Sequence, residues 1–458
     1  MKFEKYSELC VKYILNNKLL APDFCKNIKI LENSKIIQKI REAIKLPVKL
    51  TYSVQLSSSI EQIHDNASPP LFYLLFLVLY RKKLLDNIIE YKFECFENHD
   101  IRQFIEWYNQ NQMSIPIDDI KKVMKKHKNG IVNELYEIIF NPACKNRYDL
   151  HNLLYTNVFV PINVQNEAET NIINNIVYRF SDNSIVNIYC PNNTEQIDIT
   201  IICKIFDIFR TITGSYDNPI NLSIFAGNSK KKIYKNKTKH LSLNPTNINS
   251  GSTYPGIEIN LWRREEIYKV LIHELVHYFK LDFTVFSPGY ERTEMFTHEL
   301  INIKGEDRLF ESYTETLANI IHCALLEHYT GINVGQLLWI ETSFSLFQVA
   351  KILNYYEFNN FDQLFDKTND KIIYQTTSVL SYFIIKTGLL LNMDLFLNFI
   401  GDSIKFNKKI TEYINLVQKC IKSSSYSHIV NQHLIFIKNI KENDDFIQKT
   451  LRMTCLQI

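Results

Sequence analysis

No stretch of the sequence is apolar for long enough to cross a membrane as a helix. The most apolar run, Leu71 to Tyr80, has ten residues, about half of the length that such a helix requires. The opening segment, MKFEKYSELCVKYILNNK, also lacks the unbroken apolar core of a secretory signal, because charged residues interrupt it. We therefore expect a buried helix at Leu71 to Tyr80, a soluble protein and no membrane partner.

Cysteine pairs of the kind that build disulfide frameworks or structural zinc sites are also missing. The nine cysteines scatter from Cys10 to Cys455 without one Cys-x-x-Cys pair. An odd number of cysteines cannot form a closed set of disulfides within one chain. This usage indicates a reducing compartment inside the cell, such as the cytoplasm.

Charge of one sign is not in excess. Lys+Arg 52 against Asp+Glu 49 gives a formal net charge of +3, which is too small and too evenly spread to indicate a nucleic-acid partner. The densest basic stretch, Lys121 to Lys128 (KKVMKKHK), is typical of a solvated helix face. We expect no nucleic acid among the partners of this protein.

The chain is long enough for two or three domains, with 458 residues of which 46% are hydrophobic. Residues 1–150 show helical periodicity, as at Ile101 to Gln110 and Ile131 to Ile139, with few strand signals between. This pattern predicts a helical N-terminal domain whose role the sequence does not define. A catalytic core over 151–330 and a helical C-terminal lobe over 331–458 complete the predicted organisation.

Strands and helices alternate after Pro161, which predicts an α+β fold. Thr194 is a predicted N-cap of a helix that runs to Thr213, where Gly214 ends it. Glu265 and Glu266 fall in the predicted first turn of the next helix, where carboxylates favour the positive end of the helix dipole. The predicted strands are Ser184 to Cys190, Ile220 to Ala226, Lys239 to Leu243 and Gly256 to Leu261, and a later buried helix is predicted at Gln375 to Leu391.

The helix after the last of these strands contains His273-Glu274-Leu275-Val276-His277. Because residues i and i+4 share one face of a helix, both imidazoles can reach one metal ion. Glu274 lies beside the same ion, where it can take a proton from an activated water and deliver it to a leaving amine. A chance H-E-x-x-H is expected about once in sixty such chains, and the apolar neighbours of these histidines argue against an incidental surface pair.

A catalytic zinc site needs a third protein ligand, and a second predicted helix offers one. It reads Glu311-Ser312-Tyr313-Thr314-Glu315-Thr316-Leu317-Ala318-Asn319, in which 311, 315, 318 and 322 share one stripe. Small residues at Thr314 and Ala318 would let this helix approach the first one closely. The pattern supplies one carboxylate as a ligand and another to hold a ligand imidazole in the correct tautomer.

These motifs resemble the gluzincin metallopeptidases, in which H-E-x-x-H is completed by a glutamate on a later helix. The resemblance covers about residues 180–330 and implies a zincin-like core between helical regions, with Zn²⁺ as cofactor. It implies that His273, His277 and Glu311 bind the metal, that Glu274 is the general base, and that Glu315 supports a ligand. The whole chain also looks like uncharacterised metallopeptidases of large DNA viruses, which adds the virion as an expected location.

Two assignments within this resemblance stay open. Glu315-Thr316-Leu317-Ala318-Asn319 is another form of the same pattern, so Glu315 is the alternative third ligand, although Glu311 has an acid at i+4 and alanine at i+7. No histidine follows His277 at the short spacing of the metzincin branch.

In the resembling family the last strand before the helix, here Ile257 to Leu261, lines the cleft and pairs with an extended substrate. No spacing selects a transition-state donor from Tyr290, Arg292, His298, Arg308 and Tyr313.

The function that the sequence predicts is hydrolysis of a peptide or protein by zinc-activated water. The alternative from another class is a zincin-fold protein that has become an inactive structural or binding component. The intact Glu274 argues against that alternative, because a purely structural metal site needs no base between its histidines. A zinc hydrolase that acts on a substrate other than a peptide is a third possibility.

Overall fold

The structure is a computed structural model that describes residues 2–22, 30–57, 150, 153–154, 157, 159–171, 173–191, 197–233, 242–440 and 446–458, together with 122, 125 and 126. The helices predicted at Leu71 to Tyr80, Ile101 to Gln110 and Ile131 to Ile139 lie outside the described residues, as do Thr194 and most of the basic stretch from Lys121 to Lys128.

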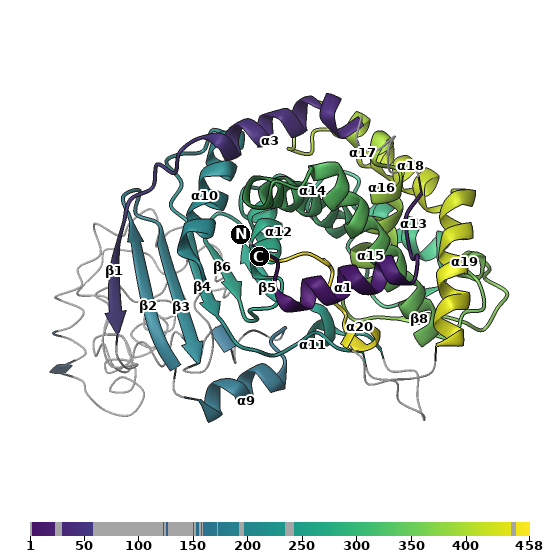
Figure 1. The fold of residues 1–458 in the computed structure, drawn as a ribbon, viewed down its shortest axis with the longest axis horizontal. Helices are drawn as coiled ribbons and strands as arrows, with labels where there is room; N and C mark the ends of the chain where they lie inside the picture. Colours follow the sequence, from purple (N-terminus) through teal and green to yellow (C-terminus); the bar gives the residue numbers. More distant parts are fainter. Residues whose placement is uncertain are drawn as a thin grey trace.

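A six-stranded mixed sheet forms one side of the described structure, in the order β1-β2-β3-β4-β6-β5 (Figure 1). Strands β3, β4 and β6 run parallel to one another. Strand β2 pairs antiparallel with β3, and β1 pairs antiparallel with β2 at one edge. Strand β5 pairs antiparallel with β6 at the other edge. The bounds are β1 Tyr52–Ser57, β2 Ile173–Phe180, β3 Ile185–Pro191, β4 Asn221–Phe225, β5 Gly251–Tyr254 and β6 Glu258–Leu261.

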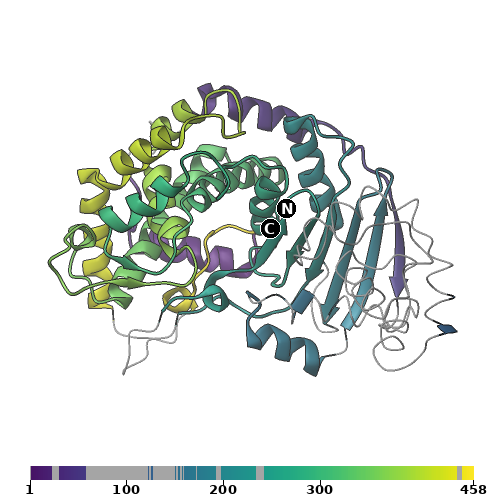
Figure 2. The ribbon, with the colours of Figure 1, turned by 180° about the vertical axis from the view of Figure 1, so that it is seen from behind.

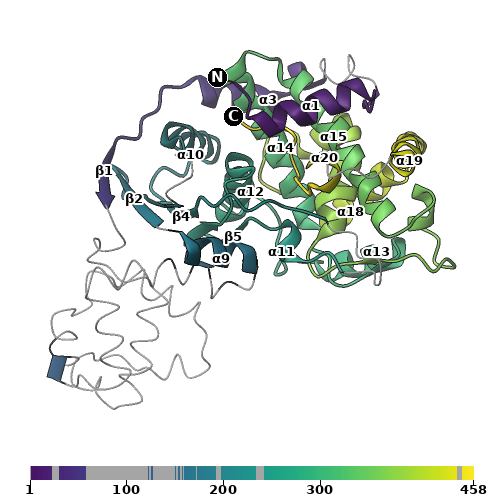
Figure 3. The same cartoon turned by 60° about the horizontal axis from the view of Figure 1, so that its bottom comes forward.

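Helices cover both faces of this sheet (Figure 3). Helices α10 (Ile199–Thr213) and α12 (Ile267–Tyr278) lie on one face, and α9 (Ile162–Thr170) lies on the other. Side chains alternate between the faces because successive strand residues point in opposite directions. The face toward α10 and α12 is lined by Val186, Ile188, Leu222, Ile224, Ile259 and Leu261, and the opposite face by Ile173, Tyr189 and Phe225.

The second half of the chain is mostly helical and packs beside the sheet (Figure 2). Together with the sheet it confirms the predicted α+β class. Its elements are α11 Pro245–Ile248, α13 Glu291–Leu300, α14 Phe310–Thr330, α15 Val334–Tyr355, the 3₁₀ helix η4 Phe361–Leu364, the π-helix η5 Leu380–Ile385, α16 Lys386–Leu391, α17 Met393–Ile400, α18 Ile410–Ile421, α19 Ser424–Asn439 and α20 Phe446–Lys449, with a small two-stranded sheet of β7 Ile303–Lys304 and β8 Ile373–Tyr374.

In the described part of the chain, no single helix combines the length and apolarity of a membrane-crossing segment. Leu380–Leu391 and Met393–Ile400 reach that threshold only as a pair, and they are bent by 94° relative to each other.

The N-terminal helices pack into the same core as the rest of the chain. Helix α1 (Lys5–Asn16) lies against α15, and α3 (Lys35–Lys45) lies against α10 and α14. Arg41 on α3 forms a two-pronged ion pair with Glu327 on α14, with both N···O distances at 2.7 Å. Most of the predicted N-terminal domain lies outside the described residues, so its boundary near residue 150 stays a prediction.

The segment Phe446–Ile458 runs through the interior and brings the two ends of the chain together. The N and C labels lie side by side in Figures 1 to 3, and the backbone N–H of Glu4 donates to the carbonyl of Gln457 at 2.8 Å. Residues Leu451 to Gln457 are all buried. This buried segment contacts Glu266, the residue that precedes α12 (Ile267–Tyr278).

Three of the four predicted strands are present as β3, β4 and β6. Of the strand predicted at Lys239 to Leu243, Leu243 forms an isolated bridge with Gln375, and 239–241 lie outside the described residues. The described helix α10 starts at Ile199, where the Asp198 side chain accepts from the N–H of Thr200, so the N-cap predicted at Thr194 is wrong. The predicted C-cap holds, since Gly214 has φ +70°. Most of the predicted helix from Gln375 onward is the π-helix η5 followed by α16.

Candidate metal centre

Helix α12 begins directly after a buried glutamate, Glu266. Glu266 has φ +62°, a conformation that non-glycine residues adopt rarely and only when the surrounding structure holds them there. Its Oε1 accepts from the N–H groups of Met453 and Thr454, both at 2.6 Å, and its Oε2 pairs with Lys231 at 2.7 Å. The prediction that Glu265 and Glu266 sit in the first turn is therefore wrong. Both precede the helix and are buried, because Glu266 binds the interior segment and the Glu265 carboxylate accepts from the N–H of Lys231.

The body of α12 is buried between the sheet and α14. Its apolar residues Leu271, Ile272, Leu275 and Val276 are fully buried, as their pattern predicted. Lys269, His273 and His277 recur every fourth residue and so form one stripe. Contacts of this stripe with Glu311 and Glu315 show that it faces α14.

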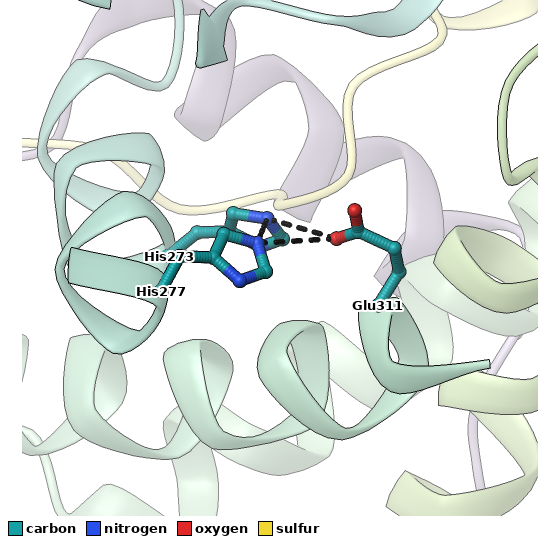
Figure 4. Close-up of side chains that lie close together, drawn as sticks. All are labelled: His273, His277 and Glu311. Atoms are coloured by element: carbon teal, nitrogen blue, oxygen red, sulfur yellow. Dashed lines mark hydrogen bonds and ion pairs between the residues drawn. The ribbon is translucent and has the colours of Figure 1, made fainter. Parts of the chain in front are cut away.

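The two histidines and Glu311 converge on one point (Figure 4). The Nε2 atoms of His273 and His277 are 3.0 Å apart, and Glu311 Oε2 lies 3.2 Å from the first and 3.3 Å from the second. Of the two glutamates considered for this position, Glu311 is the one whose carboxylate faces both Nε2 atoms. These three side chains are the group of potential metal ligands within the described residues.

The opposite ring nitrogens of both histidines face carboxylates. His277 Nδ1 lies 2.7 Å from Asp282 Oδ2, which also accepts from the Thr314 hydroxyl at 3.2 Å. His273 Nδ1 lies 3.0 Å from Glu315 Oε1, off the line of an ideal N–H···O hydrogen bond. A carboxylate at Nδ1 favours a proton on that nitrogen, which leaves the Nε2 lone pair for a metal. The role of Asp282 was not predicted, and its place five residues after His277 was the available signal.

The charges around this point favour an added cation. Burial alone would lower the pKa of His277, but Asp282 and Glu311 outweigh burial and raise that pKa well above its usual value. Burial would likewise raise the pKa of Glu311, but the nearby His277 and His273 hold it far below its usual range. Both pKa shifts have the same meaning, which is that the surroundings of these side chains stabilise positive charge. A proton or a metal ion can supply that charge.

The distances also fit a metal ion. Three ligands of a tetrahedral zinc at about 2.0–2.1 Å stand about 3.3 Å from one another, close to the separations of 3.0, 3.2 and 3.3 Å found here. Glu311 Oε2 is buried and, within the described residues, accepts no hydrogen bond of good geometry although it faces two nitrogens. A cation at the shared point would satisfy that oxygen and both Nε2 lone pairs together.

Glu274 turns from this group toward the edge strand β5. Its Oε2 accepts from the Thr253 hydroxyl at 2.7 Å, and a Cβ atom on Gly251 would stand 2.5 Å from its Oε1. Burial raises the pKa of Glu274, which the nearby His273, His277 and Thr253 oppose only in part. A carboxylate with a raised pKa is a stronger base.

The strand expected to line the cleft is not the edge strand. Strand β6 lies between β4 and β5, so its backbone groups are already paired on both sides and cannot receive a substrate. Among the described strands, the edge strand next to Glu274 is β5, whose Thr253 hydroxyl donates to the Glu274 carboxylate. Strand order is a tertiary property, and the short Gly-Ser-Thr-Tyr sequence of β5 has no apolar alternation that would have predicted it.

Tyr382 on the π-helix η5 lies beside the candidate metal centre, and the sequence analysis did not identify it. It is 7% exposed, and its ring centroid lies 6.2 Å from that of His273. Burial first, and then the charges of Glu311 and Glu274, raise its pKa well above the usual value, so the hydroxyl keeps its proton. π-Helices are rare and are often found at functional sites.

Of the five residues considered from the sequence as transition-state donors, Arg308 lies close enough to Glu311 and Tyr382 to interact electrostatically with both. Tyr313 is buried and donates to the carbonyl of Ile404, and Arg308 pairs with Glu306. Tyr290 packs beside Phe310, whereas Arg292 and His298 are exposed.

Asp307 holds the start of the π-helix. Its Oδ2 accepts from the Ser381 hydroxyl at 2.8 Å, and its Oδ1 accepts from the Ser381 N–H at 3.2 Å. Burial raises the pKa of Asp307 to about 6 despite these bonds. Asp307 thereby ties the loop before α14, which carries Glu311, to the segment that carries Tyr382.

A surface cavity lies near the site, and Asp282, which contacts His277, belongs to its lining. The three convergent residues and Glu274 do not line it, so it is distinct from the metal centre. Its walls are Asp282, Phe283, Ser287, Pro288, Gly289, Arg292, Phe406, Lys408, Lys409, Ile410 and Thr411.

Comparison with known proteins finds one distant viral relative. The chain is 24% identical over 233 residues to "Uncharacterized protein R210" of Acanthamoeba polyphaga mimivirus. The matched region covers 48% of this chain and 58% of that protein, which is less than two thirds of its length. No family model and no solved structure matches the chain. The chain is thus a distant homologue of a mimivirus protein whose name assigns it no activity.

Proposed function

We propose that this protein is a zinc-dependent metallopeptidase of the gluzincin type. The observation that carries the proposal is the convergence of His273 Nε2, His277 Nε2 and Glu311 Oε2 within 3.3 Å, with Glu274 on the same helix. Two imidazoles and one carboxylate are a ligand set that catalytic zinc sites use, with one position left for water. Zinc held there would polarise a water molecule and a substrate carbonyl and would lower the pKa of that water toward about 7.

Glu274 is the proton carrier in this proposal. It adjoins His273 in the sequence, and its carboxylate is oriented by Thr253 and by the close approach of Gly251. It takes the proton from the attacking water and passes it to the nitrogen of the leaving amine, so the same group serves as base and then as acid. Burial strengthens the carboxylate as a base by raising its pKa.

Tyr382 donates the hydrogen bond that stabilises the oxyanion. Its raised pKa keeps the phenol protonated, and its ring lies beside that of His273. A fixed donor in a buried site favours the transition state, in which the carbonyl oxygen gains negative charge.

The edge of β5 supports a peptide as the substrate class. β-Augmentation places an extended peptide along an exposed strand edge, where backbone hydrogen bonds hold it in register. Thr253 and Gly251, which contact Glu274, both belong to this strand. A peptide paired with β5 would therefore pass beside the proposed base.

Zinc content and peptide cleavage test this proposal together. Purified protein should hold close to one zinc per chain by elemental analysis, and His273→Ala or His277→Ala should abolish it. Glu311→Ala should also lose zinc, whereas Glu315→Ala should weaken affinity by about 10- to 100-fold. The wild-type protein should cleave members of a diverse peptide library, and a chelator should stop that cleavage. Loss of zinc in Glu315→Ala with zinc retained in Glu311→Ala would reverse the ligand assignment.

A further inference from the structure

A buried lysine pairs with the carboxylate that faces His273 of the candidate metal centre. Lys269 precedes His273 by one helical turn, and its ammonium forms an ion pair with Glu315 Oε2. The other oxygen of the same carboxylate lies 3.0 Å from His273 Nδ1. Glu315 therefore bridges two successive turns of α12, with Lys269 on one side and His273 on the other. Lys269 is 1% exposed and Glu315 is 2% exposed.

The carboxylate at the centre of this bridge needs a positive partner. A buried carboxylate without an oppositely charged partner is costly, and it would not keep a fixed place beside a neutral imidazole. His273 contributes no net charge when its Nε2 binds a metal, because a metal ligand is a neutral imidazole. Lys269 supplies that charge through its ion pair with Glu315 Oε2 and so holds the carboxylate in place.

We propose that Lys269 is a positioning residue for metal binding. This inference rests on the proposed zinc site and assigns Lys269 a part in its affinity. Lys269 holds Glu315, the Glu315 carboxylate faces the Nδ1–H of His273 at 3.0 Å, and the Nε2 lone pair is then left for the metal. Lys269 thus acts only through Glu315, which makes the effects of changing the two residues non-additive.

Lys386 provides a matched control, because it is a second buried lysine near Glu315. It is also 1% exposed and its charge also acts on Glu315. Its ammonium, however, donates to Ser345 Oγ and to the carbonyl of Met453, both at 3.0 Å. Lys386 therefore holds the interior segment Phe446–Ile458, and its loss should reduce stability with little effect on zinc affinity.

The experiment is a double-mutant cycle read by zinc affinity in competition with a chromophoric chelator. The full-length variants are Lys269→Met, Glu315→Gln, their combination, and Lys386→Met, each checked by thermal unfolding. Lys269→Gln serves where Lys269→Met does not fold, since its amide can still donate to Glu315 without carrying charge. We expect Lys269→Met to weaken zinc affinity by about 10-fold or more, within the range for outer partners of metal ligands.

The combined variant should bind zinc no more weakly than Glu315→Gln alone, and Lys386→Met should stay within about threefold of wild type. Additive losses, or equal losses in Lys269→Met and Lys386→Met, would overturn the assignment and leave Lys269 a structural residue. Wild-type protein that binds no zinc would instead overturn the proposed function itself. A wild type that binds zinc while Lys269→Met matches it would overturn only this inference.

Discussion

Gly251 on β5 and Glu274 on α12 approach so closely that a methyl group on the glycine would overlap the carboxylate. A Cβ at this position would lie 2.5 Å from Glu274 Oε1 and 2.8 Å from Leu261 Cδ2. The glycine is therefore required for the place that Glu274 takes between the helix and the edge strand.

Gly251→Ala should displace Glu274 without touching the ligands of the metal. We expect zinc content near that of wild type and a fall of at least 10-fold in peptide cleavage, because a small misplacement of a proton carrier is costly in rate. The measurement is steady-state cleavage with zinc quantified on the same samples. Wild-type rates in this variant would show that Glu274 does not depend on this contact.

Tyr382→Phe should separate oxyanion stabilisation from metal binding. Removal of one oxyanion donor costs about 10²–10³ in kcat, whereas the phenyl ring preserves the packing beside His273. We expect a loss of that size in kcat with little change in KM or zinc affinity. Tyr313→Phe is the control, since its hydroxyl donates to the carbonyl of Ile404, and it should affect stability rather than kcat. Equal kcat in wild type and Tyr382→Phe would remove Tyr382 from the mechanism.

Asp307 should make the stability of the fold fall as the pH rises from 4 to 7. Its folded-state pKa of about 6 lies above the usual aspartate value of 3.8, so the folded state binds the proton more tightly than the unfolded state does. Its contribution to the free energy of unfolding is therefore full below pH 4 and declines up to pH 6, by about 3 kcal/mol at 1.4 kcal/mol per pH unit.

Asp307→Asn should remove this dependence, because the amide cannot ionise and can still bond to Ser381. The check is chemical denaturation of both proteins at several pH values between 4 and 7. Their difference in unfolding free energy should change across this range, since other titrating groups cancel. Parallel curves would contradict a raised pKa at Asp307.

The sequence predicted the parts of the site that depend on one helix at a time. His273 and His277 share a face because they are four residues apart, and Glu311 and Glu315 were recognised as the two glutamates of interest. Which of the two faces the histidines depends on how α14 is rotated against α12, and no local pattern defines that rotation.

The missed features depend on contacts between distant segments. Tyr382 reaches His273 through the packing of η5 against α14, and β5 becomes the edge strand only through the order of the sheet. Glu265 and Glu266 looked like first-turn helix residues, but the segment Phe446–Ile458 arrives from the far end of the chain and binds Glu266. The fold class could still be predicted, because it follows from the periodicity of buried residues along each segment. Strand order and the first residue of a helix depend instead on contacts between distant segments.

Substitution of Glu274 by glutamine is the most direct test of the enzymatic account. The amide has the same size as the carboxylate but cannot accept the proton from water. Glu274→Gln should therefore keep wild-type zinc content and folding while losing about 10²–10⁴ in cleavage rate. The measurement is cleavage of one diverse peptide library by both proteins, with zinc determined on each sample. Cleavage of the same peptides at equal rates by wild type and Glu274→Gln would contradict the account, since the chemistry would then occur without this carboxylate.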